Sequence, residues 1–236
     1  MNDWSSYALE DLLMFSATTY FRMFELHNAT WWPAFLVGAA GLGVAMFYHR
    51  FSLMLVALGI IWGFVGYAFV SHQYGPIFPY AEYLAWGFGW QAAVFVLLAF
   101  EQNMLEWQFE EGFRTTLGIG TLLFSLYLNP LLFLFSERSF TSIELFAVAP
   151  DPTVLATSAL LLLLGGTGRW LLMPVALVWS VFSLLTLWAL GIYALVFAPA
   201  LSLGCIGVAL VPVGGTRAPT CSGNPNVDRR PPPPPT

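Results

Sequence analysis

Long apolar runs separated by short polar stretches are the dominant pattern of this chain. Each run approaches the roughly 20 residues that a helix needs to cross the hydrocarbon core of a bilayer. We expect about seven runs, at residues 31–48, 51–70, 80–100, 115–135, 153–168, 170–190 and 194–213. The pattern therefore predicts an all-α protein, a polytopic transmembrane helix bundle of about seven spans.

The two ends of the chain differ from this central part. Residues 4–27 carry polar and apolar side chains on opposite faces of a helical period, which is typical of an amphipathic helix lying in the membrane interface. The C-terminal end is polar and finishes in PPPPPT, a composition that favours a disordered or polyproline tail. We therefore divide the chain into an interfacial helix at 1–30, a transmembrane bundle at 31–213 and a cytoplasmic tail at 214–236.

Local signals predict where helices begin, bend and touch. Asn28 and Thr30 suit the N-cap of the first span, and Pro33 suits its first turn, where a missing N–H costs little. Gly59 and Gly63 form a GxxxG pair that favours close helix packing in the second span. In the fourth span, the Asn129–Pro130 pair predicts a kink.

Composition excludes several classes of function. The chain is 58% hydrophobic and 9% charged, whereas soluble domains carry roughly 25% charged residues. It contains no lysine, which excludes a phosphate-loop lysine and a lysine-bound retinal. The eight basic residues are scattered arginines apart from one pair, so we expect no nucleic-acid partner. The partner that composition does predict is the lipid bilayer, with other membrane subunits as a further possibility.

The arginines predict an orientation. With seven spans, two arginines fall on the side of the N-terminus and six on the other side: Arg50, Arg114, Arg169, Arg217, Arg229 and Arg230. Because positive residues concentrate on the cytoplasmic side, the C-terminus is predicted in the cytoplasm and the N-terminus outside. No cleavable signal peptide is evident in the acidic N-terminal stretch, so we expect a multi-pass membrane protein whose spans themselves direct insertion.

A group of polar side chains is predicted to gather at the outer face. Glu82 is the acid that enters a span, and His72 lies just before that span, ahead of a turn fixed by Pro76 and Pro79. The same topology brings His27, Asn28 and Asp151 to this face, although spacing alone does not show that they meet. The hypothesis is an outward-facing cation or proton site centred on Glu82 and His72. The alternative is that each of them is an interfacial polar group in contact with water or lipid headgroups.

No cofactor is indicated. His49 and His72 stand at opposite ends of the second predicted span, roughly 35 Å apart along a helix, so they cannot ligate one haem. A site with one histidine and another ligand stays open. The sequence leaves both metal and cofactor unknown.

Three short motifs carry a family resemblance. They are Asn28 with Trp32–Pro33, the stretch Ala149-Pro150-Asp151-Pro152-Thr153, and Pro174 with Trp179–Ser180. In these the chain resembles a bacterial family of multi-pass membrane proteins of unknown function, sometimes labelled permease-like. It departs from that family at Phe78, where the family has asparagine before the proline, and in GIYALVFAPA, where the family has a small acidic loop. The resemblance implies a multi-pass protein of a bacterial inner membrane and supplies no chemistry.

Two functions remain open. Prolines within spans and the outer polar group favour transport or sensing of a small solute or ion. Abundant aromatic side chains and glycine faces favour the alternative, an accessory or scaffold subunit of a larger membrane complex. An enzyme is not indicated, because no nucleophile–base pair, zinc spacing or phosphate loop is visible.

Overall fold

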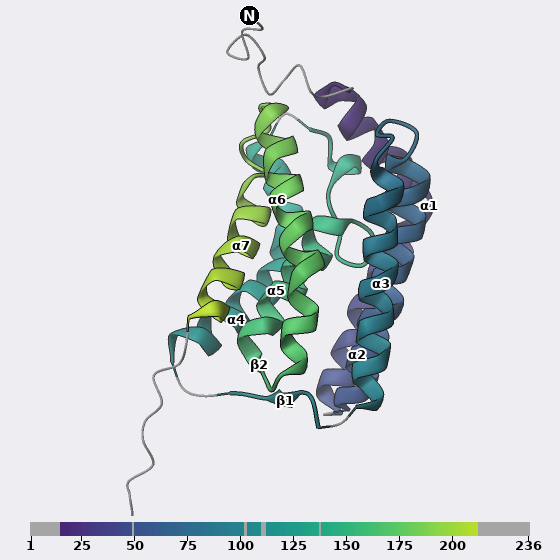
Figure 1. The fold of residues 1–236 in the computed structure, drawn as a ribbon. Coiled ribbons are helices and arrows are strands. Elements are labelled where there is room, and N and C mark those ends of the chain that lie inside the picture. Colours follow the sequence, from purple (N-terminus) through teal and green to yellow (C-terminus); the bar gives the residue numbers. More distant parts are fainter. Residues whose placement is uncertain (1–14, 49, 102, 110–111, 137, 212–236) are drawn as a thin grey trace, which may run out of the picture.

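The computed structural model describes residues 15–48, 50–101, 103–109, 112–136 and 138–211, and these fold almost entirely into helices. In Figure 1 the helices α1 to α3 stand together on one side and α4 to α7 on the other. A connector between the fourth and fifth helices runs down between these two groups. The all-α prediction is confirmed.

The first group consists of three long rods. Helix α1 spans Ala17–Phe47, and α2 spans Phe51–Phe64 and continues without a break as the π-helix η3, Val65–Tyr74. After a turn that contains Pro76 and Pro79, α3 spans Ala81–Phe100. Each apolar run thus becomes one rod, because unbroken helical hydrogen bonding leaves no backbone polar group exposed to lipid.

The second group is more broken. Helix α4, Phe113–Leu123, continues as the π-helix η4, Phe124–Leu128, and the 3₁₀ helix η5, Asn129–Phe135. A short 3₁₀ turn, η6, Phe140–Ser142, precedes α5, Pro150–Leu163. The remaining elements are the 3₁₀ turn η7, Gly168–Leu172, helix α6, Met173–Ala189, and helix α7, Phe197–Leu210.

A two-stranded antiparallel ladder closes one end of the bundle. Strand β1, Glu106–Trp107, pairs with β2, Leu164–Gly165, so the glycine-rich turn after α5 joins the polar connector after α3. Gly166 has a φ of 88°, and a side chain there would collide with the carbonyl of Met104. The glycines after α5 therefore form a tight turn held against a second connector.

The apolar exterior fits a membrane location. Among the described residues, five helical segments are long and apolar enough to cross a membrane, at 17–47, 51–74, 81–100, 113–135 and 168–189. Helices α5 and α7 are apolar but shorter, with 14 residues each. No membrane or topology is defined, so the count of seven spans and the orientation stay predictions.

The start of the first rod was predicted wrongly. Helix α1 begins at Ala17, where Ser16 accepts a hydrogen bond from the Thr19 N–H at 3.3 Å, and it runs on past Asn28 without a cap there. Pro33 lies in its interior rather than in a first turn. Tertiary contacts of Asn28 outweigh its capping tendency, as described below. The described residues do not include three parts of the prediction: residues 1–14 of the interfacial helix, the tail at 214–236 and His49.

The predicted close packing at Gly59 is confirmed. A Cβ built on Gly59 would lie 2.9 Å from a Val96 methyl and 3.0 Å from the Ala92 carbonyl, so glycine lets α2 pack closely on α3. At Asn129–Pro130 the chain changes from π-helix to 3₁₀ helix. Asn129 donates its amide to the Glu144 carbonyl at 3.3 Å, across the connector.

Candidate functional site

The connector before α5 enters the bundle. Residues 143–149, called the inward segment here, are all buried and lead directly into α5, which is buried along its whole length. Fourteen helical residues rise only about 21 Å, against roughly 30 Å for the hydrocarbon core. Because α5 ends at the β1–β2 ladder, its first turn lies inside the bundle.

The backbone at this junction is strained and tied down. Ala147 has a φ of 63°, a conformation that residues with a Cβ rarely adopt. Its N–H donates to the hydroxyl of Thr153 at 3.2 Å, and that hydroxyl donates to the Ala149 carbonyl at 2.8 Å. The two proline rings at positions 150 and 152 suit a first helical turn, where N–H groups have no helical acceptor. Local sequence thus fixes where α5 starts.

Asp151 is held in this first turn by two donors from α6. The indole N–H of Trp179 donates to Oδ1 at 2.6 Å, and the hydroxyl of Ser183 donates to Oδ2 at 2.7 Å. Asp151 is only 6% exposed. The two donors and the positive end of the α5 dipole stabilise a charged carboxylate at this position, whereas burial opposes the charge.

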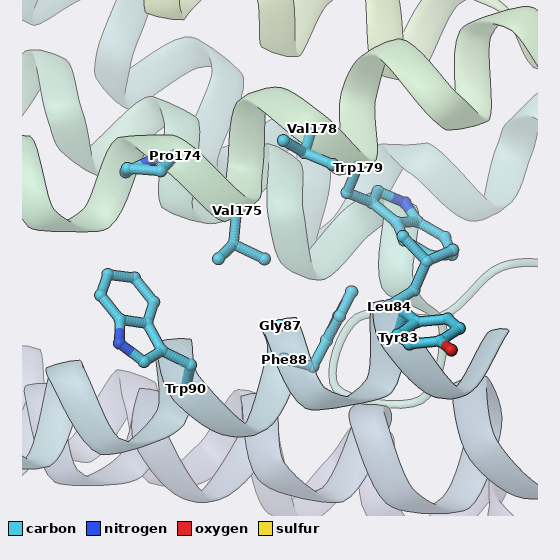
Figure 2. Close-up of a pocket in the computed structure, with 9 residues that line it drawn as sticks. All are labelled: Tyr83, Leu84, Gly87, Phe88, Trp90, Pro174, Val175, Val178 and Trp179. Carbon is cyan, nitrogen blue, oxygen red and sulfur yellow. The ribbon is translucent and has the colours of Figure 1, made fainter. Parts of the chain in front are cut away.

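Trp179 joins Asp151 to an apolar cavity. The cavity has a volume of about 340 Å³ and lies between α3 and α6, with Trp179, Val175 and Val178 facing Gly87 and Phe88. Figure 2 shows Val175 and Trp179 of α6 pointing across the gap toward α3, from which Phe88 points back. The rings of Phe88 and Trp179 meet edge to face, with centroids 5.1 Å apart. One face of Trp179 therefore contacts the cavity while its nitrogen holds the acid.

A second acid, Glu144, lies on the inward segment beside a buried arginine. Arg138 Nη1 is 3.4 Å from Glu144 Oε1, and both side chains are essentially without solvent contact, at 0% and 1% exposure. The same nitrogen donates to the Ser142 carbonyl at 3.2 Å. The Nε and Nη2 groups of Arg138 have no hydrogen-bond partner among the described residues, so part of this guanidinium is available to water or an ion.

The two acids form one electrostatic cluster. Glu144 and Asp151 are close enough to repel each other, and Arg138 acts on both. The phenols of Tyr20 and Tyr74 lie within the same field. Two carboxylates and one guanidinium carry a net charge of −1 when all are ionised. Such an unbalanced charge inside a bundle is costly unless a proton or a cation joins it.

His27 and Asn28 hold the connector against α1. The Nε2 of His27 is 3.2 Å from the Val148 carbonyl, and the Asn28 amide donates to the carbonyls of Thr141 at 2.9 Å and Ile143 at 2.7 Å. His27 Nδ1 has no partner among the described residues. These contacts replace the capping role that the sequence predicted for Asn28.

One family comparison now bears on the chain. The family of unknown function DUF6064 matches residues 17–211, which is most of the sequence. The chain belongs to the DUF6064 family. Neither a curated protein nor a solved structure matches it. Every residue of the cluster lies within the DUF6064 match, so the cluster is part of the family's own region.

The predicted site residues of this DUF6064 protein fall into two places. His27, Asn28 and Asp151 come together around the inward segment. Glu82 and His72 do not: both are exposed, and Glu82 lines a separate groove between η3 and α3. His72 Nδ1 is 3.0 Å from the Tyr67 carbonyl. The proposed centre of the outer site thus lies apart from the buried cluster.

Sequence reasoning missed the other members of the cluster. Glu144 and Arg138 looked like surface residues of a connector. Ser183 looked like an ordinary member of a span, and Trp179 entered only as part of a family motif without a chemical role. One signal was present: Glu144 is flanked by the apolar run Ile143, Leu145, Phe146, Ala147 and Val148. An acid inside a short apolar run between two helices is unusual for a solvated loop.

Proposed function

We propose that this DUF6064 member is an integral membrane protein that transports protons, alone or together with a small solute, and that Glu144 and Asp151 form its proton site. The observation that carries the proposal is a pair of buried carboxylates with one buried guanidinium at the start of a helix that begins inside the bundle. Half-length helices of this kind line substrate and ion sites in many transporters.

Charge balance makes the pair a proton site rather than a static ion pair. Arg138 compensates one carboxylate, and Asp151 already receives two hydrogen bonds that suit its charged form. Glu144 receives one long contact from Arg138. A proton arriving at Glu144 removes the net charge, and a proton leaving restores it, so small changes in the surroundings shift occupancy.

A row of hydroxyl groups supports passage from Asp151 toward the ladder end of the bundle. Ser183 contacts Asp151, and Ser180 lies one helical turn earlier on α6. Ser180 Oγ is 2.7 Å from Ser202 Oγ, which is 2.6 Å from Ser158 Oγ. Hydroxyl groups both donate and accept, so they can pass a proton along a chain that includes water.

Two phenol groups lie on the other side of the cluster, toward the end of the bundle opposite the ladder. Tyr20 lies in the first turns of α1, and Tyr74 ends η3, next to the turn before α3. Tyr74 shares a side-chain hydrogen bond with Thr186 of α6. The acid pair therefore lies between a phenol group on one side and the hydroxyl row on the other.

Reconstitution into liposomes tests the proposal. Vesicles that contain a trapped pH dye are given a potassium gradient, and valinomycin then sets a membrane potential that drives proton entry. We expect a dye response with the unaltered protein, at least tenfold less with Asp151→Asn or Glu144→Gln, and an unaltered response with Glu101→Gln. Glu101 is an exposed acid at the end of α3, so it controls for loss of a carboxylate. Equal flux in protein-free vesicles, or in all variants, would refute the proposal.

A second candidate function is that of a subunit in a larger membrane complex. A groove of about 330 Å³ between α1 and α2 is lined by Gly38, Gly41 and Ala57 among other small or apolar residues, and a Cβ on Gly41 would meet nothing within 4 Å. Small residues let another helix approach closely. Purification with a stoichiometric partner that is lost in Gly41→Leu would support this candidate.

A further inference from the structure

A second polar feature lies outside the proton site, on the surface of the first helix group. It is a groove of about 430 Å³ between the η3 end of the second rod and the start of α3. Residues Glu82, Trp86 and Gly89 come from α3, and Tyr67 and Ser71 come from η3. None of these residues belongs to the acid cluster described above.

Helical spacing creates the groove. Positions 82, 86 and 89 share one face of α3 because they are separated by four and three residues. The two rods approach closely beside this face, since a Cβ on Gly66 would lie 2.6 Å from the Phe88 Cβ. A Cβ on Gly89, in contrast, would meet no atom of the described residues within 4 Å. The groove is thus bounded by two packed helices and is open along Gly89.

The end of the groove near the turn carries the chemistry of an ammonium site. Glu82 lies in the first turn of α3, where the helix dipole favours a negative charge, and it forms no ion pair with any described residue. Trp86 and Tyr67 are 79% and 66% exposed, so their faces are available to a ligand. A carboxylate beside aromatic faces is the arrangement that attracts organic ammonium groups.

His72 steadies this arrangement from the side. Its ring lies 4.3 Å from the Tyr67 ring between centroids, and its Nδ1 is 3.0 Å from the Tyr67 carbonyl. Tyr67 is therefore held in place although it is exposed. The sequence linked His72 with Glu82 as a cation site, and the structure places His72 behind one aromatic wall of the groove.

The other end of the groove is apolar. Gly63, Gly89 and Ala85 line it, and this surface lies on two rods that are long and apolar enough to cross a membrane. A free amine would leave this part without a partner, whereas a hydrocarbon chain would cover it. Charge at one end and apolar surface at the other match the two parts of a phospholipid.

We infer that this groove binds a phospholipid with an ammonium headgroup, whose amine contacts Glu82, Trp86 and Tyr67 and whose acyl chain lies over Gly89. This inference does not depend on the proton site, because it involves other residues and a different ligand. The ammonium enters the aromatic and carboxylate end, and the chain follows the glycine-lined surface toward the middle of α3.

Native mass spectrometry of the purified protein tests the inference. The probes are phosphatidylethanolamine and phosphatidylglycerol with identical acyl chains, added separately to delipidated protein in detergent. We expect at least about fivefold tighter binding of the ethanolamine lipid, since one exposed cation–π contact is worth about 1 kcal/mol. Glu82→Gln and Trp86→Leu should each reduce this preference, whereas Glu101→Gln and Trp188→Leu should keep it.

Two further measurements distinguish binding of a whole lipid from binding of its headgroup alone. Gly89→Leu fills the apolar end and should weaken both lipids, with an unchanged melting temperature showing that the fold is intact. Free phosphoethanolamine should bind far more weakly than the lipid. Equal binding of the free headgroup would overturn the lipid assignment. If the preference for the ethanolamine lipid is the same in Glu82→Gln, in Trp86→Leu and in their controls, the site itself is overturned.

Discussion

The hydrogen bond from Trp179 to Asp151 offers a quantitative test of the charged state of the site. Replacing Trp179 with Phe keeps an aromatic ring in place but removes the N–H that lies 2.6 Å from Oδ1. A hydrogen bond to a charged group contributes about 1.5–3 kcal/mol, and the smaller ring adds about 1 kcal/mol of lost packing. We expect Trp179→Phe to lower the free energy of unfolding by about 3 kcal/mol.

A double-mutant cycle isolates the part that depends on charge. In the Asp151→Asn background the same bond is neutral and is worth about 0.5–1.5 kcal/mol. Trp179→Phe should therefore cost about 1 kcal/mol less in that background than in the unaltered protein. Trp188→Phe is the matched control, because Trp188 is 55% exposed and should change stability by less than about 0.5 kcal/mol.

Reversible unfolding by SDS in mixed micelles provides the assay. Circular dichroism reports helix loss for the unaltered protein, both single variants and the double variant, under the same lipid and detergent conditions. If Trp179→Phe costs the same free energy with and without the Asp151→Asn substitution, the bond does not sense a charge. That result would refute the assignment of an ionised Asp151.

Three further predictions concern the same region. Gly38→Ala should destabilise the protein by about 1–3 kcal/mol, because its methyl group would collide with the inward segment. Gly41→Ala, which faces open space, should be neutral or stabilising. Equal effects of the two substitutions would contradict the close packing of α1 on the inward segment. Arg138→Gln should lower the free energy of unfolding by about 3–5 kcal/mol, because it leaves Glu144 uncompensated. The loss of stability should be larger at alkaline than at acidic pH, and adding Glu144→Gln should recover part of it. A loss of stability that is independent of pH would argue against a titrating Glu144. Asn28→Ala should lower the free energy of unfolding by about 2 kcal/mol and speed hydrogen exchange in the connector, because two carbonyls lose their donor. Unaltered hydrogen exchange would show that the connector is held by other contacts.

The helical class and much of the packing could be predicted because they depend on local signals. An apolar run must satisfy its own backbone in lipid, so hydropathy alone indicates helices. Gly59 marked a close approach of two helices, and Asn129–Pro130 marked a change of helix type. In each case the physical cause lies within a few residues of the signal.

The surroundings of helix α5 were harder to predict than the helix itself. The sequence placed a span at 153–168, close to the observed Pro150–Leu163, but it did not show that the connector before it turns into the bundle. Ala147 at positive φ leads the inward segment into the first turn at Pro150, and only the folded backbone shows this. Likewise, α1 runs through Asn28 because the amide binds carbonyls more than 100 residues away, at Thr141 and Ile143.

The candidate site was half visible in the sequence. Asp151 and His27 were identified as polar groups at one end of the bundle, and the structure brings both to the inward segment. Arg138 and Glu144 were not identified, since their pairing depends on how the connector folds inward. Glu82 was identified, but it lies in the surface groove, which the sequence could not separate from the interior.

Infrared spectroscopy of the protein in lipid bilayers tests the central claim most directly, because a protonated carboxyl group has a C=O stretch distinct from that of a carboxylate. Titrating pH should reveal a buried carboxylic acid band that gains and loses intensity while the protein stays folded. We predict that Glu144→Gln removes this band and Glu101→Gln keeps it. A spectrum with no titrating buried carboxyl band, or one unaltered in Glu144→Gln, would contradict a proton site at the start of α5.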